Sequence, residues 1–109
     1  MNSTQSKKNR PQLNGELRYA CRHGELDRAK EIVAEGAEID GADFYGKTAL
    51  HGAAEWGRLD IVQYLVEQGA DLNRKTNKGL MPIDLARAFN HPRIVIYLKE
   101  MSERYGEGA

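Results

Sequence analysis

The feature that most constrains this chain is an internal repeat with a period of 33 residues. Ala20, Ala53 and Ala86 occupy one position of three successive periods, and similar apolar residues recur in register with them. Further matched pairs are Leu26 with Leu59, Val33 with Val66, Gly36 with Gly69, Ile39 with Leu72, Ile61 with Ile94 and Leu65 with Leu98. Such a period predicts a solenoid, in which each unit buries its apolar face only against its neighbours.

Each period carries the pattern of two short helices and a loop. Residues 48–57, TALHGAAEWG, begin with an N-cap hydroxyl, place apolar residues on one face and end with a glycine suited to a left-handed position. Residues 58–69 carry a broad apolar stripe, which predicts a second helix antiparallel to the first. The polar segment 70–79 has turn formers and no helical period, so it predicts a projecting, hairpin-like loop.

The central period resembles the ankyrin repeat in its sequence as well as its length. Residues 46–54 read GKTALHGAA, and only Ala49 departs from the family signature T-P-L-H-x-A, which has proline there. The third period keeps the proline at Pro82 but lacks the threonine and histidine, and the first keeps little beyond the spacing. The resemblance implies a mainly α fold, an ankyrin-repeat solenoid of three helix-turn-helix repeats joined by β-hairpin-like loops.

This resemblance divides the chain into a flexible N-terminal tail (1–11), an ankyrin-repeat domain (12–104) and a flexible C-terminus (105–109). Polar residues replace apolar ones in the outer repeats, as expected of caps that face water. Three repeats are about the minimum for independent stability, so we expect a complete small protein, with a fragment of a longer ankyrin array as the alternative. The predicted repeats cover about residues 12–42, 43–75 and 76–104.

In the third repeat, Asn90 stands where the central repeat has the helix-ending Gly57. Asparagine also visits the left-handed region, so the turn between the two helices is expected to survive the replacement. Pro92 follows at a position that suits the first turn of the next helix.

The composition offers no general attraction for polyanions. The chain has 16 basic and 16 acidic side chains, so we expect neither nucleic acid nor a membrane as partner. The single cysteine, Cys21, excludes an intramolecular disulfide and fits a reducing compartment. No apolar run approaches the roughly 20 residues that cross a bilayer, and the N-terminus lacks the apolar stretch of a signal peptide. We therefore expect a cytoplasmic protein.

One segment competes with the repeat interpretation, because residues 41–48, GADFYGKT, match the phosphate-binding loop pattern G-x-x-x-x-G-K-[ST]. A working loop of this kind follows a buried strand within a βαβ unit, and the chain shows no such pattern. Phe44 and Tyr45 also crowd positions where backbone amides would wrap a phosphate. The repeat explains the same letters, with Gly46 in a turn, Thr48 as a cap and Lys47 as a free surface position. Nucleotide binding stays the alternative function.

Catalytic and metal sites find little support. The three serines, Ser3, Ser6 and Ser102, lie in or near terminal segments, and the three histidines are too dispersed for a zinc signature. Cys21 aligns with Ala54 and is interpreted as a small core residue. His51 is expected to exchange hydrogen bonds with Thr48 and with backbone of a neighbouring loop. We therefore predict no enzyme activity, no cofactor and no metal.

The resemblance implies that a partner protein binds the concave face, which is made by the loop tips and the first helix of each repeat. Aromatic and arginine side chains on that face are the residues that most often anchor interfaces. His23, Trp56 and Phe89 lie 33 residues apart and are expected to form one row. The predicted binding residues are Arg22, His23, Phe44, Tyr45, Lys47, Glu55, Trp56, Asn77, Lys78, Leu80 and Phe89.

The sequence hypothesis is thus a monomeric protein–protein interaction module. Asn73 follows Asp71-Leu72 at a position that resembles the asparagine hydroxylated in eukaryotic members of the family, which makes hydroxylation there a further prediction.

Overall fold

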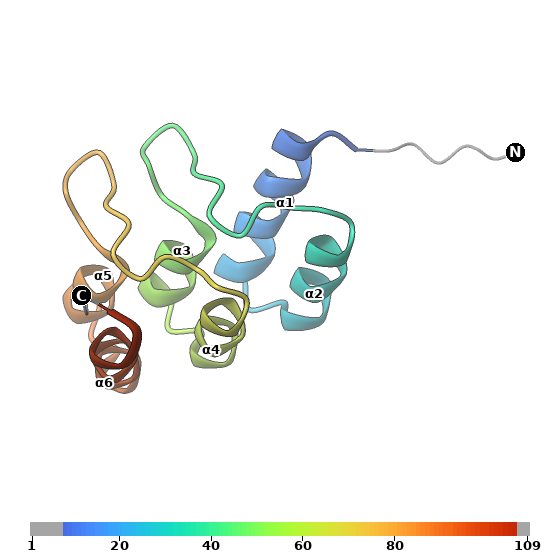
Figure 1. The fold of residues 1–109 in the computed structure, drawn as a ribbon. Coiled ribbons are helices and arrows are strands. Elements are labelled where there is room, and N and C mark those ends of the chain that lie inside the picture. Colours follow the sequence, from blue (N-terminus) through green and yellow to red (C-terminus); the bar gives the residue numbers. More distant parts are fainter. Residues whose placement is uncertain (1–7, 107–109) are drawn as a thin grey trace, which may run out of the picture.

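The computed structural model describes residues 8–106, which form six α-helices in two layers (Figure 1). The inner layer consists of α1 (Arg10–Arg22), α3 (Ala49–Glu55) and α5 (Pro82–Ala88). The outer layer consists of α2 (Leu26–Ala34), α4 (Leu59–Glu67) and α6 (Pro92–Met101). A short π-helical segment, η2 (Ser102–Gly106), continues α6. This confirms the predicted ankyrin-like stack of helix pairs.

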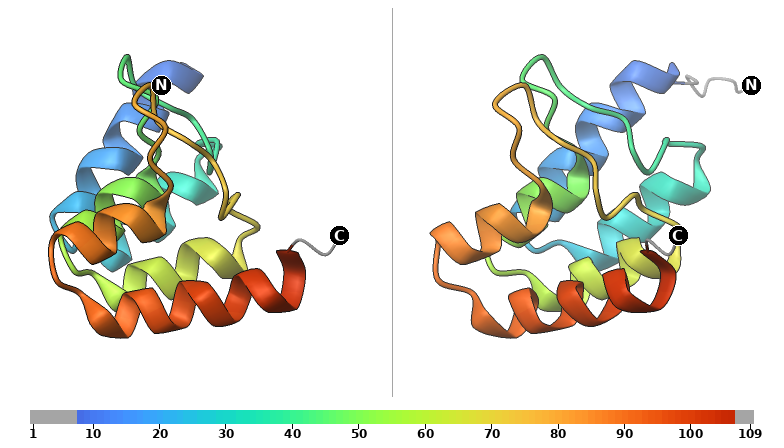
Figure 2. Two further views of the ribbon diagram at one scale, coloured as in Figure 1. Left: turned by 90° about the vertical axis from the view of Figure 1, so that its left-hand side faces the viewer. Right: turned by 60° about the vertical axis from the view of Figure 1, so that its left-hand side comes forward.

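Packing follows the period of the sequence. Helix α1 packs on α3 and α3 on α5, while each inner helix also packs on its own outer partner. Ala20, Ala53 and Ala86 lie at the fully buried junctions of the inner layer, where their small side chains let the backbones approach closely. Larger aliphatic side chains from the outer helices, such as Ile61 and Leu65, complete the core. Figure 2 shows how the helix pairs line up one behind another.

The turns between paired helices repeat with the same backbone geometry. Gly24, Gly57 and Asn90 all adopt positive φ, at 78°, 73° and 63°. The left-handed conformation predicted for Asn90 is therefore confirmed, and Pro92 starts α6 as expected. Asparagine bears this conformation at a modest cost, so the third repeat keeps its turn without glycine.

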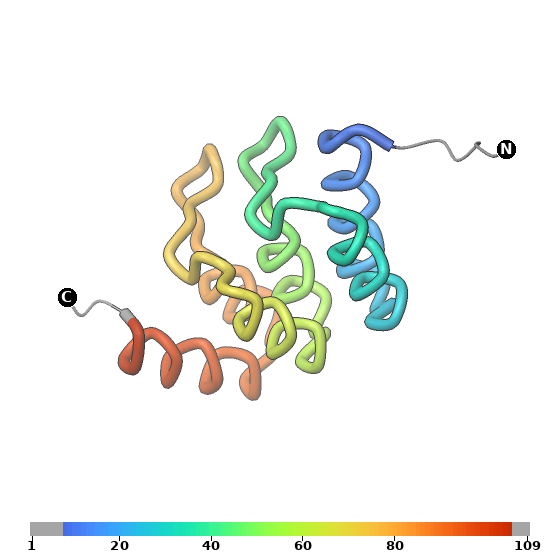
Figure 3. Tube along the Cα trace, turned by 45° about the vertical axis from the view of Figure 1, so that its right-hand side comes forward, coloured from blue at the N-terminus to red at the C-terminus, as the bar shows by residue number. Residues whose placement is uncertain are grey.

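The loops that precede α3 and α5 project from the helical layers side by side (Figure 3). The first turn is closed by a hydrogen bond from Asp43 N–H to Lys47 O (2.9 Å), and the second by one from Thr76 N–H to Leu80 O (2.9 Å). Side chains reinforce both turns, because Asp43 Oδ1 accepts from the amides of Tyr45 and Lys47 and Thr76 Oγ1 accepts from those of Lys78 and Leu80. The turns are hairpin-like, although no residue from 8 to 106 is in a regular strand.

Helical segments lie close to both ends of the described chain. Asn9 caps α1, since its Oδ1 accepts from Gln12 N–H at 2.8 Å, and α1 begins at Arg10, inside the stretch predicted as a tail. Tyr105 belongs to η2. The rest of the two predicted tails, residues 1–7 and 107–109, lies outside the described residues. Between residues 8 and 106, no helix combines the length and the apolar character needed to span a bilayer.

Candidate functional site

A groove of about 350 Å³ runs between the second and third repeats on the side of the loops. Loop residues form one wall and the inner helices α3 and α5 form the other. The lining residues are Tyr45, Lys47, Glu55, Thr76, Asn77, Lys78, Leu80, Leu85 and Phe89. The structure thus brings together seven of the eleven residues that the sequence placed on the binding face.

The loop wall of the groove is held by hydrogen bonds between the two loops. Asn77 donates its side-chain amide to Phe44 O (2.8 Å) and its backbone amide to Tyr45 O (2.9 Å). Gly46 packs so closely on Asn77 that an added Cβ would lie 2.8 Å from its Oδ1. The two loop tips therefore form one unit. The side chain of Asn77, predicted to bind a partner, holds the two loops together.

His51 fixes the same wall to the helices from below. Its side chain is fully buried, and its Nδ1 accepts a hydrogen bond from Thr48 N–H at 3.0 Å. Because Nδ1 is an acceptor, the ring proton sits on Nε2 and is donated to Leu80 O at 2.9 Å. The expected bonds from His51 to Thr48 and to loop backbone are thus confirmed. Burial lowers the pKa of His51, which favours this neutral form.

Of the two lysines that line the groove, one is paired with a carboxylate among the described residues and the other is not. Lys47 Nζ lies 2.6 Å from Glu55 Oε1, and both side chains are largely covered. The expectation of a free surface lysine at this position is therefore wrong, because Lys47 joins the loop to helix α3. Lys78 is exposed, and its ammonium contacts no carboxylate of residues 8–106. The groove consequently carries one cation without a counterion from the described chain.

The other four predicted residues lie outside the groove. Phe44 is at the tip of its loop and is 96% exposed, which is unusual for an aromatic side chain. Trp56 is the C-cap of α3, one helix length from the tips, and is 53% exposed. Arg22 ends α1 and His23 caps it, and the His23 ring stacks on Tyr19 with centroids 4.1 Å apart.

His23, Trp56 and Phe89 occupy equivalent structural positions, since they are the C-caps of α1, α3 and α5 and share nearly the same backbone angles. The three inner helices pack side by side, so the caps follow one another along the stack. Only Phe89 reaches the groove between the loops and the helices.

Two lining residues, Thr76 and Leu85, were not predicted from the sequence. Thr76 stands one period after Asp43, and each of the two side chains accepts hydrogen bonds from amides of its own loop. An alignment of the two loops could therefore have revealed Thr76. Leu85 is four residues before Phe89 and therefore lies on the same face of α5. The central repeat has Gly52 at the position equivalent to Leu85, so it gives no signal for a side chain there.

The segment 41–48 has the structure of a repeat turn. Gly46 N–H closes the turn on Asp43 O, Lys47 is paired with Glu55, and Thr48 caps α3 through its hydroxyl. Helix α3 has only seven residues, and residues 35–40 before the segment form no strand. This geometry leaves neither the lysine nor the hydroxyl for a phosphate and metal, which argues against nucleotide binding.

Cys21 lies in the core, as the sequence predicted, and is fully buried. Burial raises the pKa of its thiol to about 12, so the thiolate needed for nucleophilic chemistry is scarce at neutral pH. No three His, Cys, Asp or Glu side chains within the described part of the chain gather as a metal site requires.

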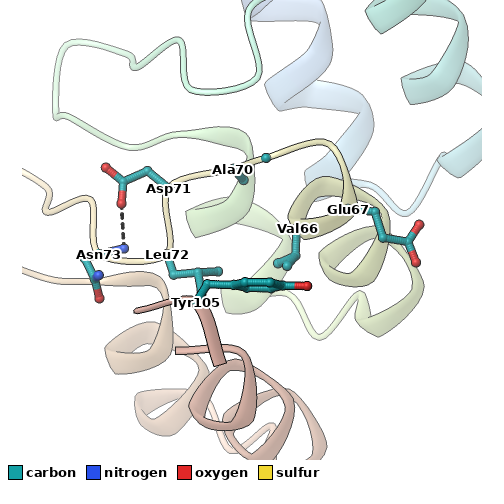
Figure 4. Close-up of a pocket in the computed structure, with 8 residues that line it drawn as sticks. Val66, Glu67, Ala70, Asp71, Leu72, Asn73 and Tyr105 are labelled. Carbon is teal, nitrogen blue, oxygen red and sulfur yellow. Dashed lines mark hydrogen bonds between the residues drawn. The ribbon is translucent and has the colours of Figure 1, made fainter. Parts of the chain in front are cut away.

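A second cavity, of about 500 Å³, lies at the end of α4 and away from the predicted binding residues. Tyr105 of η2 extends over Val66 and Leu72 there, as Figure 4 shows. Asn73 is at the rim of this cavity and is exposed, so a modifying enzyme could reach it. Hydroxylation of Asn73 stays a prediction.

Comparisons with known proteins cover most of the stack. A family model described as ankyrin repeats (3 copies) matches residues 8–76. Potassium channel AKT1 of Arabidopsis thaliana is 36% identical over 86 residues, which are 78% of this chain and 10% of the channel. Ankyrin repeat and SOCS box protein 11 of Homo sapiens is 30% identical over 90 residues, which are 83% of this chain and 28% of that protein.

An enzyme is among the relatives as well. The mitochondrial liver isoform of glutaminase from Rattus norvegicus is 30% identical over 91 residues, which are 82% of this chain and 15% of the enzyme. The chain thus spans less than a third of the length of each of these three relatives. The match to the family model covers more than half of the chain, and with the repeating helix pairs it shows that the chain belongs to the ankyrin-repeat family.

Proposed function

We propose that this chain is a protein-binding module whose partner lies on the inner face, defined as the surface made by the loop tips and helices α1, α3 and α5. Ankyrin repeats generally serve as protein-interaction modules. On this proposal the chain works in the cytoplasm as a monomer, with no cofactor, no catalysis, and neither nucleic acid nor membrane as partner.

One observation carries the proposal: four large aromatic side chains, on the loop before α3 and at the C-caps of α3 and α5, are left at least half exposed. Phe44 and Tyr45 are 96% and 71% exposed, and Trp56 and Phe89 are 53% and 51% exposed. The core of the stack is complete without these parts of the rings. Exposed aromatics on a rigid surface are the usual anchors of protein interfaces, because they bury much area at a small entropic cost.

Hydrogen bonds hold the inner face in place before a partner binds, which favours the proposal. The tips are tied by Asn77, and His51 ties the loop before α5 to α3. A surface ordered before binding loses less entropy when a partner docks, so more of the contact energy remains as affinity.

The test uses capture of partner proteins from the native cell with immobilised wild-type chain, followed by affinity measurement on the captured partner. Phe44→Ala and Trp56→Ala should each weaken binding by about 2 kcal/mol or more, as truncation of interface anchors does. Tyr105→Ala is the matched control, because Tyr105 is an exposed aromatic on η2, outside the inner face.

Thermal melts of the three variants establish that each is folded before affinities are compared. Binding that survives both inner-face substitutions but is lost in Tyr105→Ala would place the partner elsewhere and refute the proposal.

A further inference from the structure

The groove between the second and third repeats has the chemistry of a small apolar pocket with one charged edge. Leu80 and Leu85 supply aliphatic surface, and Tyr45 and Phe89 add aromatic rings from the loop and from α5. Its volume of about 350 Å³ is at the lower end for sites that take a ligand group, which are about 300–1,000 Å³. It suits a single large apolar side chain and not an extended apolar surface.

The charges around the groove select for an anion beside that side chain. The carboxylate of Glu55 is already paired with Lys47 at 2.6 Å. Asp43, at the base of the loop, is engaged by the amides of Tyr45 and Lys47. Lys78 is the lining cation that no carboxylate of residues 8–106 neutralises, and its backbone is held by Thr76.

We propose that this groove takes an extended acidic segment of the partner protein, with one large apolar side chain between Tyr45 and Phe89 and a neighbouring carboxylate on Lys78. The inference rests on the proposed function and specifies the chemistry of the partner at this place. The burial of the apolar side chain supplies most of the affinity, while the ion pair sets register and selects against basic segments.

Preorganisation makes the groove suited to a segment of this kind. Hydrogen bonds from Asn77 to Phe44 and Tyr45 fix the loop wall, and the Leu80 carbonyl is held by His51. Lys78 therefore projects from a fixed turn, so its ammonium stays within reach of the apolar pocket.

The experiment selects ligands from random sequences, so the partner need not be identified first. A phage-displayed library of random linear peptides is panned on the folded wild-type chain, and the enriched peptides are synthesised and titrated. We expect enrichment of Asp or Glu next to Leu, Phe or Trp. Lys78→Glu should weaken the selected peptide by about tenfold or more, and Phe89→Ala should do the same.

The matched control is Lys99→Glu, which makes the same charge change on an exposed lysine of the outer helix α6 and should leave the peptide affinity unchanged. A second control exchanges the acidic residue of the selected peptide for lysine. This peptide should bind the Lys78→Glu variant better than the wild type, because the ion pair is restored with opposite signs. Thermal melts of all variants confirm that they are folded.

The inference is overturned if no peptide is enriched, if the enriched peptides are neutral or basic, or if Lys78→Glu and Lys99→Glu bind alike. These outcomes are separable from failure of the proposed function. A whole partner that depends on Phe44 and Trp56 but is indifferent to Lys78→Glu refutes only the inference, whereas indifference to the entire inner face refutes both.

Discussion

The second and third repeats use different residues at the junction between loop and inner helix. In the second repeat, His51 accepts from Thr48 N–H and donates to Leu80 O in the next loop. In the third, Asp84 accepts from Met81 N–H at 2.8 Å and makes no hydrogen bond to another loop among residues 8–106. Both side chains secure the start of their own helix, but only the histidine also holds a neighbour.

The first repeat shows that the bond from an inner helix to the next loop does not need a histidine. Arg18 stands 33 residues before His51, and its guanidinium donates to Gly41 O at 2.9 Å. An arginine and a histidine thus make the same kind of bond to the next loop. What the fold requires at this position is a donor that reaches forward, and the histidine of the family signature is one way to supply it.

The largest effect is expected when the third repeat is removed. A chain that ends at residue 75 loses α5 and α6, which cover α3 and α4, and it leaves Nε2 of His51 without Leu80 O. Two repeats bury too little apolar surface for a stable domain, so we expect no cooperative unfolding transition by circular dichroism or calorimetry.

The control for this truncation removes residues 1–8, which spares the Asn9 cap of α1 and should change little. A two-repeat chain that still melted sharply in the temperature range of the full chain would show that the third repeat is not needed to stabilise the first two.

A smaller but still large effect is expected for His51→Ala. The substitution leaves Thr48 N–H without its partner in a buried site, removes one of the two hydrogen bonds that Leu80 O accepts, and opens a cavity, which should cost about 2–4 kcal/mol. Asp84→Ala removes one capping bond at a half-exposed site and should cost about 1 kcal/mol. Urea unfolding of the two variants measures the difference, and equal losses would mean that the forward bond of His51 contributes nothing.

The pH dependence of stability tests the role of His51 without a mutation. The pKa of His51 is lower in the folded chain than its ordinary value of 6.5, because the ring is buried. The unfolded chain then binds more protons below pH 6.5, so stability is complete above that pH and declines as pH falls towards the folded pKa. Urea titrations from about pH 7.5 to 5.5 should show this decline.

Nuclear magnetic resonance of the ring protons provides the direct readout, since His51 should remain neutral in the folded chain at pH values where a free histidine is charged. A His51 ring that titrates at or above its ordinary pKa would show that the buried neutral tautomer is wrong.

The sequence was sufficient to predict most of the fold, because the 33-residue period indicates which segments form the stacked helix pairs. Apolar residues at fixed spacing, Thr48 as a cap and Asn90 as a left-handed residue each give a local signal with a definite structural meaning. The role of Arg18 was not foreseen. Its bond to Gly41 joins residues 23 apart in sequence, and no local pattern reports a contact between a helix and a loop this far along the chain.

The composition of the candidate site was predictable to a lesser degree. Columns of the repeat alignment identified which residues face the loops, and seven of them meet in the groove. The alignment gives positions on one repeat at a time, so it could not show that Lys47 is neutralised by Glu55 or that Trp56 stands apart from the groove. Those facts depend on side-chain directions and on the rigid-body placement of neighbouring repeats.

A small effect on stability, in the range of that expected for Asp84→Ala, is expected for Trp56→Ala, and it sharpens the comparison of repeats because Trp56 and Phe89 are equivalent caps. Because about half of the ring is covered, we expect a loss of about 1–2 kcal/mol. A fully buried tryptophan would cost about 3–5 kcal/mol. Fluorescence gives an independent reading, since Trp56 is the only tryptophan and its emission should be red-shifted and quenched by iodide. A blue emission that iodide does not quench, together with a loss in the range of a buried tryptophan, would assign Trp56 to the core and leave His23 and Phe89 as the caps available to a partner.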